Sequence, residues 1–133
     1  MGPRSPAETH ERWTQAFRAK DVDALVELYE PDAVFVPEPG QEVQGRQAIR
    51  EVLTGFLGVG GEFDMHSTRA IGAADLAIVY SKWRLSGGRD AEGNAVDLDG
   101  ETTDVVRRQP DGSWLFAIDN PYGVALPEAS PAA

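Results

Sequence analysis

Hydrophobic residues recur every three or four positions in the first part of the chain, and this spacing predicts two short helices in tandem. The first begins at Ser5, a capping residue followed directly by proline, and it places Trp13 and Phe17 on one inward face. Asp21 can cap the second helix, and Pro31 forbids its continuation. The chain therefore opens with two helices that each offer an apolar face to a core.

The pattern then changes to a short strand, a third helix and a long β-rich part. A β-prone run at 33–36 predicts a strand that ends at Glu38, before a turn of prolines and glycine. Apolar residues at helical spacing after Gly45 predict a third helix, which the glycines within 58–61 end. From there the period drops to two, and we expect four strands, at residues 63–71, 76–85, 96–108 and 114–119.

The order α-α-β-α-β-β-β-β predicts an α+β domain in which three N-terminal helices cover one face of a curved, five-stranded sheet. Parallel neighbours would need a crossover helix, and the last four strands have none between them, so we expect a mainly antiparallel sheet. A chain of 133 residues suits one domain. We place that domain at residues 1–125 and expect a flexible, proline- and alanine-rich tail at 126–133.

Charge and composition narrow the possible partners. The 22 acidic and 12 basic residues give a formal net charge of −10, which is the wrong sign for holding a nucleic-acid backbone. No run approaches the roughly 18 apolar residues that a membrane-spanning helix needs, so we expect no membrane partner and a cytoplasmic location. The chain has no cysteine, which excludes disulfides, thiol nucleophiles and thiolate metal sites.

Six segments, considered together, form a family pattern: Trp13 to Phe17, Asp21 to Leu25 with Leu28 and Tyr29, Asp32 to Val36, Gly45 to Arg50, Asp104 to Arg108, and Asp111 to Trp114. Together they resemble the ketosteroid-isomerase-like, SnoaL-like superfamily, which is also called nuclear transport factor 2-like. The resemblance covers residues 8–123. The resemblance implies a cystatin-like cone, with short helices over a curved sheet that wraps an apolar ligand pocket, and chemistry without an organic cofactor.

The resemblance also implies roles for three residues. In ketosteroid isomerases a tyrosine on the first helix and an acid on a late strand bind a developing oxyanion, while a carboxylate after the first strand moves the proton. Trp13 stands in the place of the tyrosine and offers an indole N–H instead of a phenol. Asp104 matches the late-strand acid, and Glu38 lies one residue from the place of the base. True ketosteroid isomerase activity is therefore disfavoured, although Asp104 in an apolar pocket could stay protonated and donate a hydrogen bond.

A further set of residues is expected around the pocket. We expect the lining to include Trp13, Phe17, Trp83, His66, Thr102, Asp119 and Asn120. Thr102 shares a strand face with Asp104 by alternation. Asp119 and Asn120 close the last strand, where they either reach the pocket mouth or cap the sheet. Inward tryptophans are more often core residues than ligand contacts, but in a cone the two roles can coincide.

Each polar candidate has a plain structural alternative. Asp104 would then be a carboxylate that is hydrogen-bonded to the helix layer or paired with Arg108. Glu38 would be an exposed turn residue, and His66 an exposed or satisfied histidine. Neither histidine lies in a ligand-spaced motif, so we expect no metal site. The alternating acids at 97–101 are expected on a solvated strand face and not in a calcium site.

The leading functional hypothesis is a small-molecule-binding pocket protein with proton-transfer chemistry, as in an isomerase, cyclase or dehydratase, acting on an apolar carbonyl compound. Asp104 would be the acid or oxyanion donor, and Glu38 or His66 the base. The alternatives are a non-catalytic ligand carrier or sensor and an association module. The resemblance also implies a homodimer that pairs through the exposed sheet face, where charged residues such as Lys82 and Arg107 would lie.

Overall fold

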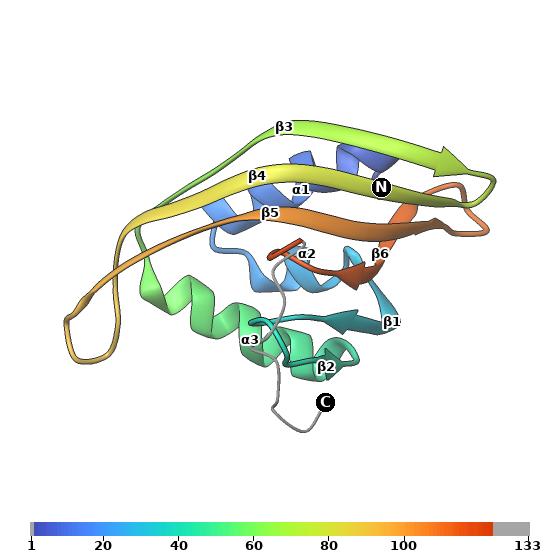
Figure 1. Ribbon diagram of the computed structural model, residues 1–133. Coiled ribbons are helices and arrows are strands. Elements are labelled where there is room, and N and C mark those ends of the chain that lie inside the picture. The colour runs from blue at the N-terminus through green and yellow to red at the C-terminus, as the bar shows by residue number, and fades with distance from the viewer. Residues whose placement is uncertain (1, 124–133) are drawn as a thin grey trace, which may run out of the picture.

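The computed structural model describes residues 2–123 and shows three helices packed on one curved sheet of six strands (Figure 1). The predicted tail at 126–133, and the domain boundary at 125, lie outside the described residues. In chain order the elements are α1 (Pro6–Arg18), α2 (Val22–Val26), β1 (Tyr29–Phe35), β2 (Val43–Gln44), α3 (Arg46–Val59), β3 (Glu62–Ala73), β4 (Leu76–Arg89), β5 (Ala95–Arg108) and β6 (Trp114–Asp119). The α+β class and the cone-like packing of helices on a curved sheet are confirmed.

The helix starts follow the caps that the sequence predicts. The Ser5 side chain accepts a hydrogen bond from the backbone N–H of Glu8 at 3.3 Å, and the Asp21 side chain accepts one from the N–H of Ala24 at 3.0 Å. These bonds satisfy amide groups that the first turn of a helix leaves free. The third helix begins directly after Gly45, as expected.

The second helix is shorter than its apolar spacing predicts. It ends at Val26, and Tyr29 already belongs to β1. The carbonyl of Leu28 accepts a hydrogen bond from the N–H of Phe116 on β6, at 2.8 Å. The residues that would have formed another helical turn therefore pair with β6 instead. The first strand spans Tyr29–Phe35, so it ends three residues before the expected end at Glu38.

The strand order is β2-β1-β6-β5-β4-β3, and every neighbouring pair is antiparallel except β1 and β6, which are parallel. The expected sheet had five strands, and the sixth, β2, has only two residues, too few for a periodic pattern to detect. Parallel neighbours require a long connection. Here β2, α3 and the strands β3 to β5 lie between β1 and β6 along the chain.

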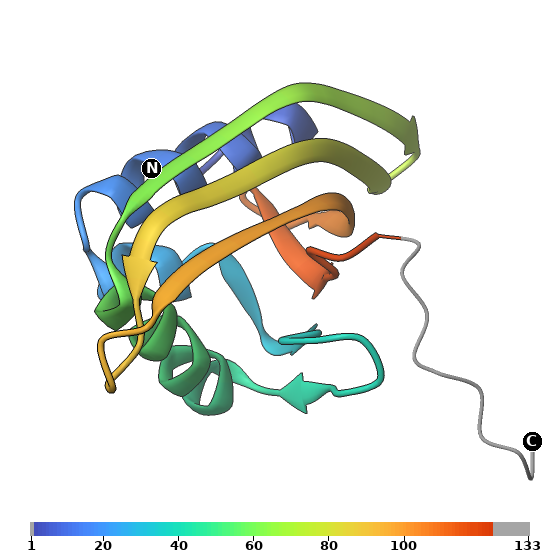
Figure 2. The ribbon, with the colours of Figure 1, turned by 60° about the vertical axis from the view of Figure 1, so that its left-hand side comes forward.

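The three longest strands bend together and enclose the helices on their concave side. Figure 2 shows β3, β4 and β5 arching over α1, with α3 at the far end of the hollow. Alternation along β4 decides what faces this hollow, because Val79, Trp83 and Leu85 are buried whereas Lys82 and Arg84 are exposed. Within residues 2–123, no helix combines the length and apolar character needed to cross a membrane.

Candidate functional site

A cavity lies on the concave side of the sheet, between α1 and the long strands, and its wall is mainly aromatic. The rings form a continuous series of contacts: Trp13 lies 4.9 Å from Phe17 and 5.1 Å from Phe63, Phe63 lies 6.1 Å from Trp83, and Trp83 lies 5.8 Å from Tyr122, all between centroids. The space that the centre of a water molecule can occupy is about 50 Å³. One buried water needs at least roughly 10–15 Å³ of such space, so the cavity suits a compact ligand.

Two carboxyl groups, Asp104 on β5 and Asp119 on β6, line this cavity. Both side chains are buried, at 2% and 5% exposure. The charge of Asp104 helps to raise the pKa of Asp119, so the two carboxyl groups interact. Asp104 Oδ1 also accepts a hydrogen bond from the backbone N–H of Asn120 at 2.7 Å. The pair therefore forms where two neighbouring strands bring inward-facing acids together.

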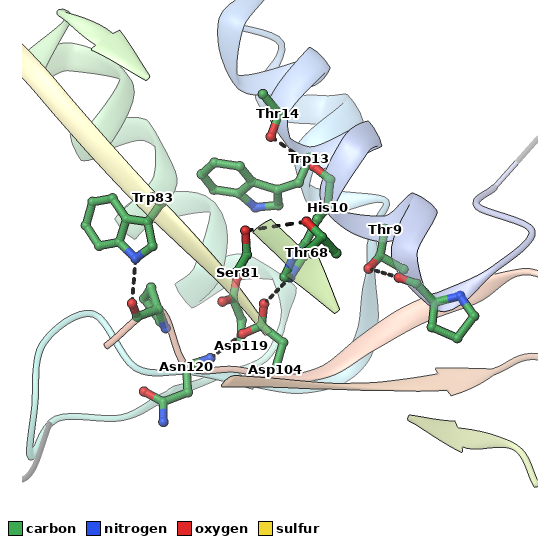
Figure 3. Close-up of polar contacts among 12 residues, drawn as sticks. Thr9, His10, Trp13, Thr14, Thr68, Ser81, Trp83, Asp104, Asp119 and Asn120 are labelled. Carbon is green, nitrogen blue, oxygen red and sulfur yellow. Dashed lines mark hydrogen bonds and ion pairs between the residues drawn. The ribbon is translucent and has the colours of Figure 1, made fainter. Parts of the chain in front are cut away.

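His10 and Tyr29 extend this pair in opposite directions. His10 Nε2 lies 2.7 Å from Asp104 Oδ2, and Figure 3 shows His10 and Trp13 reaching from α1 toward the two acids. The Tyr29 hydroxyl donates a hydrogen bond to Asp119 Oδ2, and it accepts one from the indole N–H of Trp13 at 2.9 Å. The polar groups of α1, β1, β5 and β6 thus form one hydrogen-bonded chain at the end of an apolar cavity.

Burial governs the proton affinities of this chain. It raises the pKa of Asp104 from 3.8 to about 7 and lowers the pKa of His10 from 6.5 to about 4. Burial, and then the charge of Asp104, raise the pKa of Asp119 well above its usual range. Burial and the neighbouring Asp119 likewise raise the pKa of Tyr29. At neutral pH His10 is therefore neutral, and burial favours the protonated forms of both acids.

The turn after β6 closes one side of the cavity. The indole N–H of Trp83 donates to the carbonyl of Pro121 at 2.5 Å, and the ring of Tyr122 meets Trp83 edge-on. A Cβ added at Gly100 would lie 2.7 Å from the Pro121 oxygen and 2.8 Å from the Trp83 indole nitrogen. Glycine at this position therefore lets the turn lie directly on β5.

Six of the residues expected around the pocket line this cavity: Trp13, Phe17, Trp83, Thr102, Asp104 and Asp119. Their roles toward a ligand stay predictions. Asp104 has the features of both predictions, a pocket acid and a structural carboxylate. It lines the cavity, and it is also hydrogen-bonded to the helix layer through His10. The alternative partner, Arg108, is paired with Asp75 instead.

Three expected site residues need correction. His66 is exposed and does not line the cavity, because Met65 before it takes the inward position on β3. Glu38 is exposed in the turn after β1, and it is not among the residues that line the cavity. Burial, and then the charge of Glu38, raise the pKa of the half-buried Tyr122. Asn120 reaches Asp104 with its backbone N–H, while its side chain bonds to the carbonyl of Gly123.

Sequence reasoning missed two members of the site, His10 and Tyr29. His10 lies three residues before Trp13, a spacing that puts both on one helical face, and this spacing was the available signal. For Tyr29 the signal was that a buried tyrosine needs a partner for its hydroxyl. His10 Nδ1 has no hydrogen-bond partner among the described residues.

Metal-ligating groups do not cluster in the part of the chain that the structure describes: no three His, Asp or Glu side chains there are arranged to hold a metal ion. The acids at 97–101 alternate along β5 on its exposed face, as expected. The ionisable groups of the hydrogen-bonded chain beside the cavity are Asp104, Asp119, His10 and Tyr29.

Comparison with known proteins decides the family. The model of the SnoaL-like domain matches residues 10–116. The chain belongs to the SnoaL-like family. The predicted ketosteroid-isomerase-like, nuclear transport factor 2-like superfamily is thereby confirmed, and no curated protein matches this SnoaL-like chain.

Solved structures support the same fold. A Mycobacterium tuberculosis protein of unknown function is 21% identical, with a TM-score of 0.74 over 93% of this chain and 79% of that one. A ketosteroid isomerase-like protein from Erwinia carotovora atroseptica is 21% identical, with a TM-score of 0.70 over 89% and 92% of the two chains. A Thiobacillus denitrificans protein, assigned as a calcium/calmodulin-dependent protein kinase type II association domain, is 20% identical, with a TM-score of 0.73 over 94% and 99%. At these identities the likeness concerns the fold alone.

Proposed function

We propose that this SnoaL-like protein binds a small, mainly apolar carbonyl compound in the aromatic cavity and moves a proton on it without an organic cofactor, as an isomerase, cyclase or dehydratase does. The observation that carries the proposal is that two buried carboxyl groups, Asp104 and Asp119, lie together on the cavity wall. An acid with a pKa near 7, such as Asp104, can both give and accept a proton at neutral pH.

The residues have separate roles in this proposal. Asp119 donates a hydrogen bond toward the substrate oxygen in its protonated form, and Asp104 accepts the proton taken from carbon. His10 holds Asp104 in place and Tyr29 holds Asp119, so both act as positioning residues. This assignment replaces Glu38 and His66 as the source of the base.

Tryptophan fluorescence tests binding, because Trp13 and Trp83 line the cavity. A panel of small cyclic and aromatic ketones should give saturable quenching. Asp104→Asn should weaken binding more than about tenfold, which corresponds to about 1.4 kcal/mol. The matched control is Asp99→Asn, the same change on the exposed face of the same strand, and it should leave the affinity within about twofold.

Proton transfer is tested separately from binding. In deuterated water the bound ketone should lose the NMR signal of the hydrogens next to its carbonyl group, and Asp104→Asn should stop this exchange. Binding without exchange would instead identify a carrier or sensor. A folded protein that binds no member of the panel would favour the association module.

The proposal includes a homodimer formed through the outer face of the sheet. Five apolar residues lie there in cross-strand register, one on each of five neighbouring strands: Ile71, Ile78, Val105, Ile118 and Val34. Beside this row the cross-strand pairs Lys82–Glu101 and Arg84–Asp99 present both signs of charge, which a second copy can complement. Sedimentation at several concentrations should show a dimer that Ile78→Asp dissociates, and a wild-type monomer throughout would contradict it.

A further inference from the structure

The acid pair of the cavity has no cationic partner among the described residues. Buried carboxylates are normally paired with Arg, Lys or a metal, because an isolated charge is costly to remove from water. The described ion pairs of Arg and Lys all join groups elsewhere, on helix surfaces, strand ends and the outer sheet face. His10 is the single basic side chain on the described cavity wall, and at neutral pH it carries no charge.

The rest of the wall also favours positive charge. Trp13, Phe63, Trp83 and Tyr122 are linked by the ring contacts described above and enclose the space in front of the acids. The faces of aromatic rings are electron-rich and attract organic cations, with tryptophan the strongest of them. The formal charge of −10 on the whole chain adds a field that draws cations toward it.

We infer that the cavity is built for a small apolar compound that carries a positively charged nitrogen, which lies against the aromatic faces and pairs with Asp104 and Asp119. The inference rests on the proposed function in one respect, that this cavity is the ligand site, and it adds the charge of the ligand. A neutral compound would offer no counter-ion to the ionised form of Asp104. A cation supplies that counter-ion and uses the ring faces at the same time.

Proton release is a direct consequence. At a pH near 7 Asp104 is partly protonated, and a bound cation favours its ionised form. On binding, the Asp104 O–H bond therefore breaks, the proton passes to solvent, and a carboxylate–ammonium pair remains. Asp119, Tyr29 and His10 face the same group, so the released proton belongs to this network as a whole. A neutral ligand of the same shape has no such effect.

The test uses benzylamine, a cation at pH 7, and benzyl alcohol, which is neutral and nearly identical in shape. Titration calorimetry in two buffers of different ionisation enthalpy gives both the affinity and the number of protons released. We expect the amine to bind at least about tenfold more tightly than the alcohol, with proton release for the amine alone. Asp104→Asn should reduce the preference to below about threefold, and Asp99→Asn should keep it within about twofold of the wild type.

Each outcome has a clear meaning. Equal binding of alcohol and amine, or amine binding without proton release, would overturn the inference and leave the proposed function intact. Binding of the ketone panel but of neither benzyl compound would also overturn the inference alone. Failure of every compound to bind the folded wild type would end both. If Asp104→Asn does not fold, Asp119→Asn gives the same comparison, and the proton count on the wild type needs no variant.

Discussion

The two faces of the sheet contain the same kinds of residue and put them to different uses. On β5, Asp99 points outward into water, whereas Asp104 points inward and is 2% exposed. The outer acid faces Arg84 across the strands, while the inner acid faces Val79. Alternation along the strand decides which face a carboxylate lies on, and the surroundings on that face then decide its pKa. The same residue type is therefore a solvated charge on one face and a group that retains its proton on the other.

The largest expected effect comes from placing one more carboxylate on each face of β4. Val79→Asp would add an acid opposite Asp104, in a fully buried position, and should cost more than about 4 kcal/mol of unfolding free energy. Ile78→Asp, one residue away on the outer face, should cost less than about 1 kcal/mol per folded chain. Denaturant unfolding followed by circular dichroism measures both, and equal costs would contradict the two-face comparison.

The pH dependence of stability should reveal the effect of burial on Asp104. The folded protein holds the Asp104 proton up to a pKa of about 7, whereas the unfolded chain loses it near 3.8. This group therefore contributes stability below pH 4 that is lost as the pH rises toward 7. Relative to the wild type, Asp104→Asn should gain roughly 2 to 4 kcal/mol between these limits.

His10 contributes the opposite slope, because its lowered pKa makes the folded state reject a proton between about 4 and 6.5. The difference between wild type and Asp104→Asn therefore reports Asp104 together with its effect on the pKa of Asp119. A flat difference over this range would mean that Asp104 ionises normally in the folded protein.

A smaller effect is expected where the turn after β6 lies on β5. Gly100→Ala would place a methyl group within 2.8 Å of the Trp83 indole nitrogen and even closer to the Pro121 oxygen. We expect a loss of about 1 to 3 kcal/mol and a change in tryptophan fluorescence. Gly55→Ala on α3, where an added Cβ meets nothing within 4 Å, should instead gain about 0.5 to 1 kcal/mol.

The smallest effect concerns the hydrogen bond between Trp13 and Tyr29. Trp13→Phe removes the indole donor and should cost about 1 kcal/mol from that bond, in addition to the lost ring area. A double-mutant cycle with Tyr29→Phe isolates the hydrogen bond from the change in packing. Additive costs in the cycle would show that the two groups do not interact in solution.

The sequence predicts the helix starts and the strand periods because their causes are local. Ser5 and Asp21 cap their own helices, and alternation along residues 96–108 separates inner from outer side chains. The same reasoning failed at Tyr29, where the helical spacing continues but the residue pairs with β6. Its partner, Phe116, is 87 positions away, so the local periodicity does not reveal the pairing.

The resemblance and the pattern of positions along the chain identify Asp104 and Trp13 as residues of the pocket. They do not show that His10 is hydrogen-bonded to Asp104. His10 and Asp104 are 94 residues apart, and Tyr29 and Asp119 are 90 apart. The amino-acid sequence by itself determined the α+β class, the inward set of β4 and β5, and the presence of an acid on the inner face, since each depends on neighbours within a few residues. Only the tertiary structure decided that two buried acids lie beside a neutral histidine. Burial and cross-strand proximity set their proton affinities, and both exist only once the sheet has closed over the helices.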